Sequence, residues 1–176
     1  MNEIKGMEKL NKAITNTLKP FGISEARLTD EYAYMFTDES VNFKITEDTI
    51  GDRMFAEFIE ERFDYKVRFP FVVSILHEIG HHKTNDDIDG SVYDFCEKEK
   101  IKLTEDMEKA KTEEEIRKLQ YRYFNLPDEI VATAWAVNYC KEHPKKVETL
   151  WKKMETALMD FYKENGVLDE IEGEVS

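Results

Sequence analysis

Most of the chain repeats its apolar residues every three or four positions, which is the period of an amphipathic α-helix. The first such segment, residues 3–18, is followed by Pro20 and Gly22, which predict its end. Another segment, over about 69–83, is apolar on nearly all sides and is therefore predicted to be buried. In order, the predicted helices cover about residues 3–18, 51–63, 69–83, 127–143 and 145–164.

Residues 31–47 show a different period. Apolar and polar residues alternate there in two short runs, which the polar residues 37–40 separate. Such alternation is typical of strands with one buried face, so the segment predicts a hairpin of two half-buried strands. We therefore expect an α+β fold class: mainly helical, with a small antiparallel sheet or hairpin and one buried helix. The alternating apolar positions are Tyr32, Tyr34, Phe36, Val41, Phe43 and Ile45.

Glu and Lys dominate residues 97–118. Two nearby segments, Ser91 to Asp94 and Thr112 to Glu115, have the spacing of a capping box, so each predicts the start of a helix. Charged residues that follow helix starts are typical of a solvated helical face rather than a binding tail. The sequence therefore predicts a charged helical hairpin over about 91–124.

Length and charge narrow the classes of function. The 176 residues contain no repeat and no linker, so they fit a single domain over 1–176, with an acidic tail that frays from about 166 to 176. The 38 acidic and 25 basic residues give a net charge of −13, which repels phosphate backbones and anionic lipid. We therefore expect no direct nucleic-acid binding and no membrane binding.

The sequence also favours a cytoplasmic protein. Residues 1–19 are charged throughout and do not resemble a signal peptide. The longest apolar run, residues 69–76, is far shorter than the roughly 20 residues of a membrane-spanning helix. Two cysteines, Cys96 and Cys140, suit a reducing compartment, and we expect both to be small buried hydrophobic residues.

The most informative motif is His77-Glu78-Ile79-Gly80-His81, in the predicted buried helix. Residues four apart share one helix face, so His77 and His81 have the spacing that lets two imidazoles bind one zinc ion. Glu78 lies about 100° further around the helix, where it can take a proton from a zinc-bound water. The alternative is a pair of core histidines with Glu78 as their partner, but burying an unmatched Glu is costly. We therefore predict one zinc ion per chain.

A catalytic zinc site needs a third protein ligand, and its fourth position is left for water. Glu129 is the leading candidate, because the small residues Ala132, Thr133 and Ala136 follow it on one face and would let its helix approach the motif closely. Asp128 lies on a bulkier face and is a candidate for orienting a ligand histidine. Acidic residues in a first helical turn also complement the helix dipole, which is the alternative role for both carboxylates.

Several other residues remain weaker candidates. His143 and the aspartates of the loop 86–89 could supply the third ligand instead of Glu129. The loop also resembles the start of a calcium-binding loop, but its twelfth position is Cys96 rather than Glu. His82 could contact substrate, and a tyrosine could stabilise an oxyanion. The sequence does not choose among Tyr93, Tyr121, Tyr123 and Tyr139.

The segment 76–82, a later helix with Glu129-x-x-Ala132 and a preceding strand pair resemble the short bacterial and phage metallopeptidases of the ImmA/IrrE type, within the gluzincin group. The resemblance implies a zincin-like fold and an intracellular zinc endopeptidase that acts on a regulatory protein such as a repressor. It also implies that His77, His81 and Glu129 bind zinc and that Glu78 is the general base. The 48 residues from His81 to Glu129 exceed the separation expected for this family, and the charged hairpin fills the difference.

The leading prediction is thus a zinc-dependent metallopeptidase that hydrolyses a peptide bond of a protein substrate. The alternative is a catalytically silent, zinc-stabilised interaction or regulatory module, in which a fourth protein group would close the metal site. A third reading is the deformylation of small formylated peptides. That chemistry needs a cysteine ligand in a glycine-rich neighbourhood, and neither Cys96 nor Cys140 lies in one.

Overall fold

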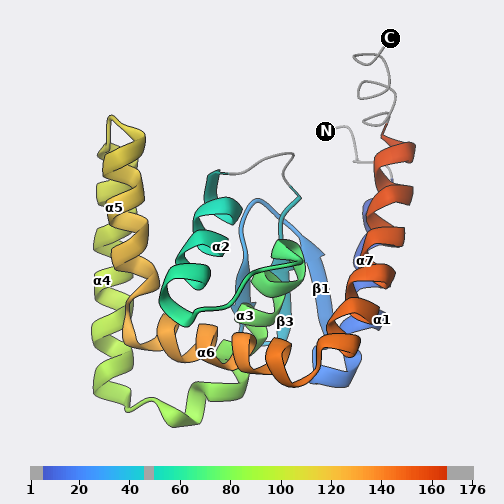
Figure 1. Cartoon of the computed structure of the whole chain (residues 1–176), viewed down its shortest axis with the longest axis horizontal. Coiled ribbons are helices and arrows are strands. Elements are labelled where there is room, and N and C mark those ends of the chain that lie inside the picture. The colour runs from blue at the N-terminus through green and yellow to red at the C-terminus, as the bar shows by residue number, and fades with distance from the viewer. Residues whose placement is uncertain (1–5, 46–49, 166–176) are drawn as a thin grey trace. The chain divides into compact units, whose positions relative to one another are not determined.

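The computed structural model describes residues 6–45 and 50–165, and the chain divides into two compact units (Figure 1). One unit combines residues 1–45 with 143–176, and the other consists of residues 46–142. The predicted fraying tail, the first three residues of the first predicted helix and the end of the predicted hairpin lie outside the described residues.

The first unit contains a three-stranded sheet in the order β1-β3-β2. Its strands are β1 (Glu25–Leu28), β2 (Ala33–Met35) and β3 (Ser40–Phe43). Strands β2 and β3 are antiparallel, with Tyr34 opposite Val41, which confirms the predicted hairpin. Strand β1 pairs in parallel with β3, so the sheet is mixed and the expectation of an antiparallel sheet was wrong for this strand.

Strand β1 gives only a weak sequence signal, because Ala26 is its one buried residue. The strand is supported instead by helix α1 (Met7–Leu18), which packs against it. The Ala26 N–H donates to Thr15 Oγ1 and the Leu28 N–H donates to Asn11 Oδ1, each at 2.8 Å. Side chains of a helix thus satisfy the backbone donors of an edge strand, a long-range contact that a local pattern does not reveal.

Helix α1 ends as its sequence predicts. A short 3₁₀ helix, η1 (Lys19–Phe21), follows it, and Gly22 then adopts a left-handed conformation with φ 87° that a residue with a side chain would rarely take. Helix α1 also packs along α7 (Pro144–Glu164), which lies in front of it in Figure 1. The contact buries apolar residues of both helices: Leu10, Ile14 and Leu18 of α1, and Met154, Leu158 and Phe161 of α7.

The second unit is entirely helical over its described residues. Its central pair is α3 (Pro70–Thr84) and α6 (Pro127–Glu142), and α2 (Ile50–Phe63) packs against both. Helices α3 and α6 both begin with proline, whose φ angle fits a helix and whose missing N–H would have no partner within the helix at that position. Helices α3 and α6 touch closely at Gly80, where a Cβ atom would overlap the Ala132 carbonyl oxygen and come within 3.0 Å of Ala132 Cα.

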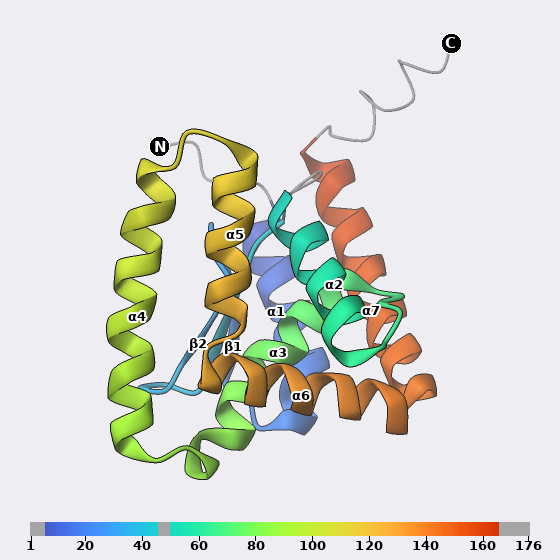
Figure 2. The same ribbon diagram turned by 60° about the vertical axis from the view of Figure 1, so that its left-hand side comes forward.

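The charged stretch folds as two antiparallel helices, α4 (Gly90–Lys109) and α5 (Glu113–Phe124), which lie side by side in Figure 2. The short helix η2 (Asn85–Asp87) leads into α4. Thr112 and Glu115 form the predicted capping box at the start of α5. The predicted box at Ser91 was wrong: Asp89 caps α4 instead, because its carboxylate accepts the Ser91 N–H at 2.9 Å.

The described elements are mainly helical and include one small sheet, which agrees with the predicted α+β class. Over residues 69–83 the expectation of a buried helix is confirmed, since most of α3 is buried. None of the helices described is both long and apolar enough to cross a membrane.

Candidate metal centre

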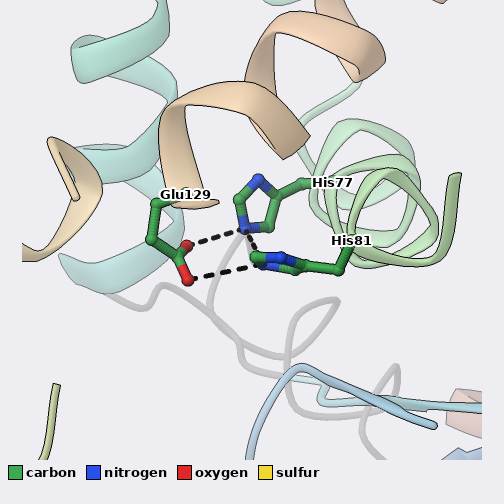
Figure 3. Close-up of side chains that lie close together, drawn as sticks. All are labelled: His77, His81 and Glu129. Carbon is green, nitrogen blue, oxygen red and sulfur yellow. Dashed lines mark hydrogen bonds and ion pairs between the residues drawn. The ribbon is translucent and has the colours of Figure 1, made fainter. Parts of the chain in front are cut away.

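Two histidines and one carboxylate converge between α3 and α6 (Figure 3). His77 and His81 are one turn apart on α3, and Glu129 comes from the first turn of α6. His77 Nε2 lies 3.0 Å from Glu129 Oε2, and His81 Nε2 lies 3.4 Å from Glu129 Oε1. The two Nε2 atoms are 3.2 Å apart. The structure therefore brings together the three residues that the sequence singled out as ligands.

Small residues make this convergence possible. Glu129 reaches the histidines because α6 presents Ala132, Thr133 and Ala136 to its neighbours, and all three are buried. On the facing helix, Gly80 contacts the Ala132 backbone directly. A close helix–helix approach of this kind shortens the distance that a Glu side chain must span, as the small-residue pattern predicted.

The hydrogen bonds around His77 fix which of its nitrogens carries a proton. The Thr133 hydroxyl donates to the Glu129 carbonyl oxygen at 2.7 Å, so its oxygen is left to accept the N–H of His77 Nδ1 at 3.0 Å. A neutral His77 then presents the lone pair of Nε2 to Glu129. Threonine thus holds the ring in the tautomer that a metal ligand needs.

The donor set fits a cation. In the neutral tautomer of His77, two lone-pair atoms, Nε2 and Glu129 Oε2, face each other at 3.0 Å and repel unless a proton or a metal ion lies between them. Four ligands at about 2.0–2.2 Å from a tetrahedral metal are about 3.3–3.6 Å from one another. The separations of 3.0 Å between His77 Nε2 and Glu129 Oε2 and of 3.2 Å between the two Nε2 atoms are close to that range, and one donor atom from each residue lies within 4.8 Å of the other two. This group could therefore bind a metal ion.

The charges of the site are strongly perturbed. Burial alone would raise the pKa of Glu129, but hydrogen bonds from His77 and His81, when their Nε2 atoms carry protons in place of a metal ion, hold that pKa well below the usual value. Burial lowers the pKa of His81, yet Glu129 outweighs it and the pKa of His81 is raised. Glu129 is thus ionised near neutral pH, as a ligand carboxylate must be.

Glu78 lies beside this group and is not part of it. Its Oε1 is 3.9 Å from His77 Nε2, on the side of the ring that faces the other two donors. Only 8% of the residue is exposed, and burial raises the pKa of its carboxyl group. A carboxylate that binds protons more readily than usual, next to a metal-binding group, has the properties of a general base.

Two neighbours of the centre were not predicted. Lys100, from α4, contacts Asp128 and lies 2.7 Å from Glu129 Oε1. Phe55, from α2, packs edge-on against His77 with ring centroids 5.0 Å apart. Lys100 could have been noticed, since it falls on the same face of α4 as Cys96 and Leu103, the two buried residues of that helix.

Asp128 does not have the role predicted for it. It is buried and ion-paired with Lys100, while Thr133, rather than a carboxylate, meets His77 Nδ1. The proposal that Asp128 orients a ligand histidine was therefore wrong for His77. The reason is geometric: consecutive residues on a helix point about 100° apart, so Asp128 and Glu129 cannot both face the histidines.

The remaining candidates lie elsewhere. Asp86 and Asp87 are exposed in η2, and Asp89 is used as a helix cap. His143 is the residue that precedes α7 and belongs to the first unit, and His82 is half-buried after the motif. Cys96 and Cys140 are buried and reduced, as expected.

Of the four tyrosines, Tyr123 lies near the charged groups of the centre. Lys100 Nζ is 5.7 Å from its ring centroid. Burial, and then the charge of Glu129, raises the pKa of its hydroxyl group. The Tyr121 hydroxyl instead donates to Glu61 at 3.1 Å, and Tyr139 stacks on Trp135.

Comparison with models of known protein families, with curated protein sequences and with solved structures finds no match to this chain.

Proposed function

We propose that the protein is a zinc-dependent metallopeptidase that acts in the cytoplasm and hydrolyses a peptide bond of a protein substrate. The observation that carries the proposal is the buried convergence of His77, His81 and Glu129, with the carboxylate of Glu78 beside it. The resemblance of the motif and of the Glu129 helix to peptidases of the ImmA/IrrE type supports the same function and a zincin-like fold.

Zinc is the metal that this donor set favours. Two imidazole nitrogens and one carboxylate oxygen are the protein ligands of catalytic zinc in several metallopeptidases, where the fourth position stays open. The three donors of this centre come from His77, His81 and Glu129. Harder ions such as magnesium and calcium prefer oxygen ligands alone, so they fit this set less well.

The residues of the chain then have distinct tasks. When bound, zinc would polarise the scissile carbonyl and lower the pKa of a water molecule. Glu78 accepts a proton from the attacking water at its carboxylate and returns it to the leaving amine. The burial that raises the pKa of Glu78 brings it nearer to neutrality, where one group can both accept and donate a proton. Phe55, packed against His77, shields the ring from solvent.

The substrate class follows from the reaction and from the resemblance. A glutamate together with a zinc ion held by two histidines is suited to the hydrolysis of amide bonds. The ImmA/IrrE-type peptidases that the motif resembles cleave regulatory proteins. A regulatory protein of the same cell is therefore the proposed partner. The net charge of −13 disfavours direct contact with nucleic acid.

The replacement Glu78→Gln tests the proposal. It removes the base and keeps the size of the side chain, so turnover should fall at least about a hundredfold, the lower range of general-base catalysis. The assay incubates zinc-loaded protein with a peptide library prepared from a cell proteome and counts new amino termini by mass spectrometry. The exposed Glu108→Gln is the matched control and should keep full activity.

Each outcome separates the candidate functions. Cleavage by wild type and by Glu108→Gln, but not by Glu78→Gln, supports the peptidase. Equal cleavage by all three variants would contradict the role of Glu78. A wild-type protein that binds one zinc ion per chain and cleaves no peptide would favour the silent, zinc-stabilised module.

A further inference from the structure

Lys100 is the one cation among the described residues that contacts Glu129 through an ammonium group. Its Nζ lies 2.7 Å from Glu129 Oε1 and is also hydrogen-bonded to Asp128 Oδ2. Only 17% of the Lys100 side chain is exposed, although it comes from the highly charged helix α4. Glu97, one turn away on α4, lies at the longer distance of 3.7 Å. A lysine that loses most of its hydration for contacts with buried carboxylates has a role beyond surface solubility.

The carboxylates around it explain its burial. Asp128 and Glu129 are 2% and 3% exposed, so two adjacent acidic residues of α6 are both withdrawn from water. An ionised carboxylate in such a place is strongly unfavourable unless a cation pairs with it. When Glu78 is also ionised, the three buried carboxylates of the site carry three negative charges against the one positive charge of Lys100, and the two negative charges left over match a divalent metal ion.

Lys100 divides the two oxygens of Glu129 between different partners. Oε2 is the oxygen near His77 Nε2, at 3.0 Å, whereas Oε1 is bound by Lys100 at 2.7 Å. His81 Nε2 is further from Oε1, at 3.4 Å. An ammonium group that occupies Oε1 competes with a metal ion for that oxygen.

We propose that Lys100 is a positioning residue that makes Glu129 a one-oxygen ligand, bound to the metal through Oε2 alone. The inference rests on the metal centre of the proposed function. Asp128 anchors the ammonium group from the other side, so the lysine is held by two oxygens of neighbouring residues. A ligand restricted to one oxygen keeps the coordination number low and leaves a position free for water.

The coordination number of bound cobalt(II) tests this directly. Cobalt replaces zinc in such sites, and its visible absorption is intense when four-coordinate and weak when the coordination number is higher. In Lys100→Met, Oε1 is released and can join the metal, so the absorption should weaken. Cobalt should also bind at least about tenfold more tightly, since a nearby positive charge has been removed.

Three further variants make the measurement specific. Lys102→Met changes an exposed lysine of the same helix and should keep the wild-type spectrum. Asp128→Asn keeps a side-chain oxygen that can accept a hydrogen bond from Lys100, so Lys100 should stay on Glu129 and the spectrum should match wild type. Lys100→Met leaves the Asp128 carboxylate buried and unpaired, so the double variant Lys100→Met with Asp128→Asn provides a form without that charge. Its spectrum should weaken as in the single variant.

The outcomes distinguish this inference from the proposed function. Wild-type protein that binds neither zinc nor cobalt overturns both. Wild-type protein that binds one cobalt ion, with the same absorption intensity in the Lys100 variants, overturns the role of Lys100 and leaves the metal centre intact. Weaker affinity without a change in the spectrum would also overturn it, because a residue that only packs the site would act in that way.

Discussion

Helices α3 and α4 both supply side chains to the metal centre, and they do so from opposite environments. Ten of the fifteen residues of α3 are buried, against two of the twenty residues of α4. The side chains of His77, Glu78 and His81 on α3 therefore stand on a helix that is packed on nearly all sides. Lys100 instead reaches the centre from a helix whose other charged residues are exposed or half-buried.

The difference separates two ways of placing a polar group. On α3, packing fixes the backbone, and the short side chain of His77 needs one further hydrogen bond, to Thr133, to fix its ring. On α4, one long side chain spans the distance, and its position depends on the two carboxylates that it meets. Perturbing α3 should therefore change the metal centre and the fold together, whereas perturbing α4 away from Lys100 should change neither by much.

The largest effect is expected for Glu129→Gln. An amide lacks the charge that balances the metal and binds zinc poorly, so the zinc dissociation constant should rise more than about a hundredfold, beyond the range for outer neighbours of a metal site. The measurement is zinc competition with a chromophoric chelator, together with metal content after purification. Glu108→Gln, on the exposed side of α4, should match wild type. Undiminished binding by Glu129→Gln would reject Glu129 as a ligand.

Packing between α3 and α6 gives the next effect, through Gly80→Ala. The added Cβ would overlap the Ala132 carbonyl oxygen, so the helices must separate, at a cost of about 1–3 kcal/mol in the free energy of unfolding. Gly90→Ala, at the start of α4, meets no atom within 4 Å and should change stability by less than about 1 kcal/mol. Chemical denaturation of both variants measures the contrast. Equal stability would mean that α3 and α6 are not packed closely at Gly80.

The same contrast explains how much could be predicted from the sequence. The apolar residues of α3 and the motif at 77–81 lie in one continuous segment. The helix, its burial and the spacing of its histidines could therefore be predicted from that segment alone. Glu129 was predicted as a ligand from the small residues that follow it on the same helix face, since a glutamate side chain can reach the metal only when the two helices pack closely. The hairpin of β2 and β3 has regular alternation and was predicted correctly.

Features that depend on distant partners were not predicted. Strand β1 has one buried residue, and its edge is satisfied by Thr15 and Asn11 of α1. Lys100 stands in a run of Glu and Lys, where only its place on the face of Cys96 and Leu103 indicates that it points inward. Thr133 was noticed for its size, while its hydroxyl group orients His77. In each case the deciding interaction joins residues that are remote in sequence.

Thr133→Val tests whether that hydroxyl group matters. Valine keeps the shape and leaves the His77 Nδ1 proton without its acceptor, so zinc affinity should fall about 10–100-fold. Thr133→Ser retains the hydroxyl group and should stay near the wild-type affinity. Zinc competition measures both variants. Equal affinity in the valine and serine variants would mean that packing alone holds the ring.

The smallest effect concerns the charged hairpin, through Thr112→Ala. Thr112 Oγ1 accepts the Glu115 N–H at 3.2 Å, and the Glu115 carboxylate accepts the Thr112 N–H. Loss of this cap should cost about 1 kcal/mol in the free energy of unfolding. Thr104→Ala, an exposed position inside α4, should cost less, because alanine favours a helix interior. Zinc affinity should stay unchanged in both variants, since the cap acts on α5 and the metal centre depends on α3 and α6. A tenfold loss of affinity in Thr112→Ala would show instead that the hairpin as a whole, and not Lys100 alone, supports the site.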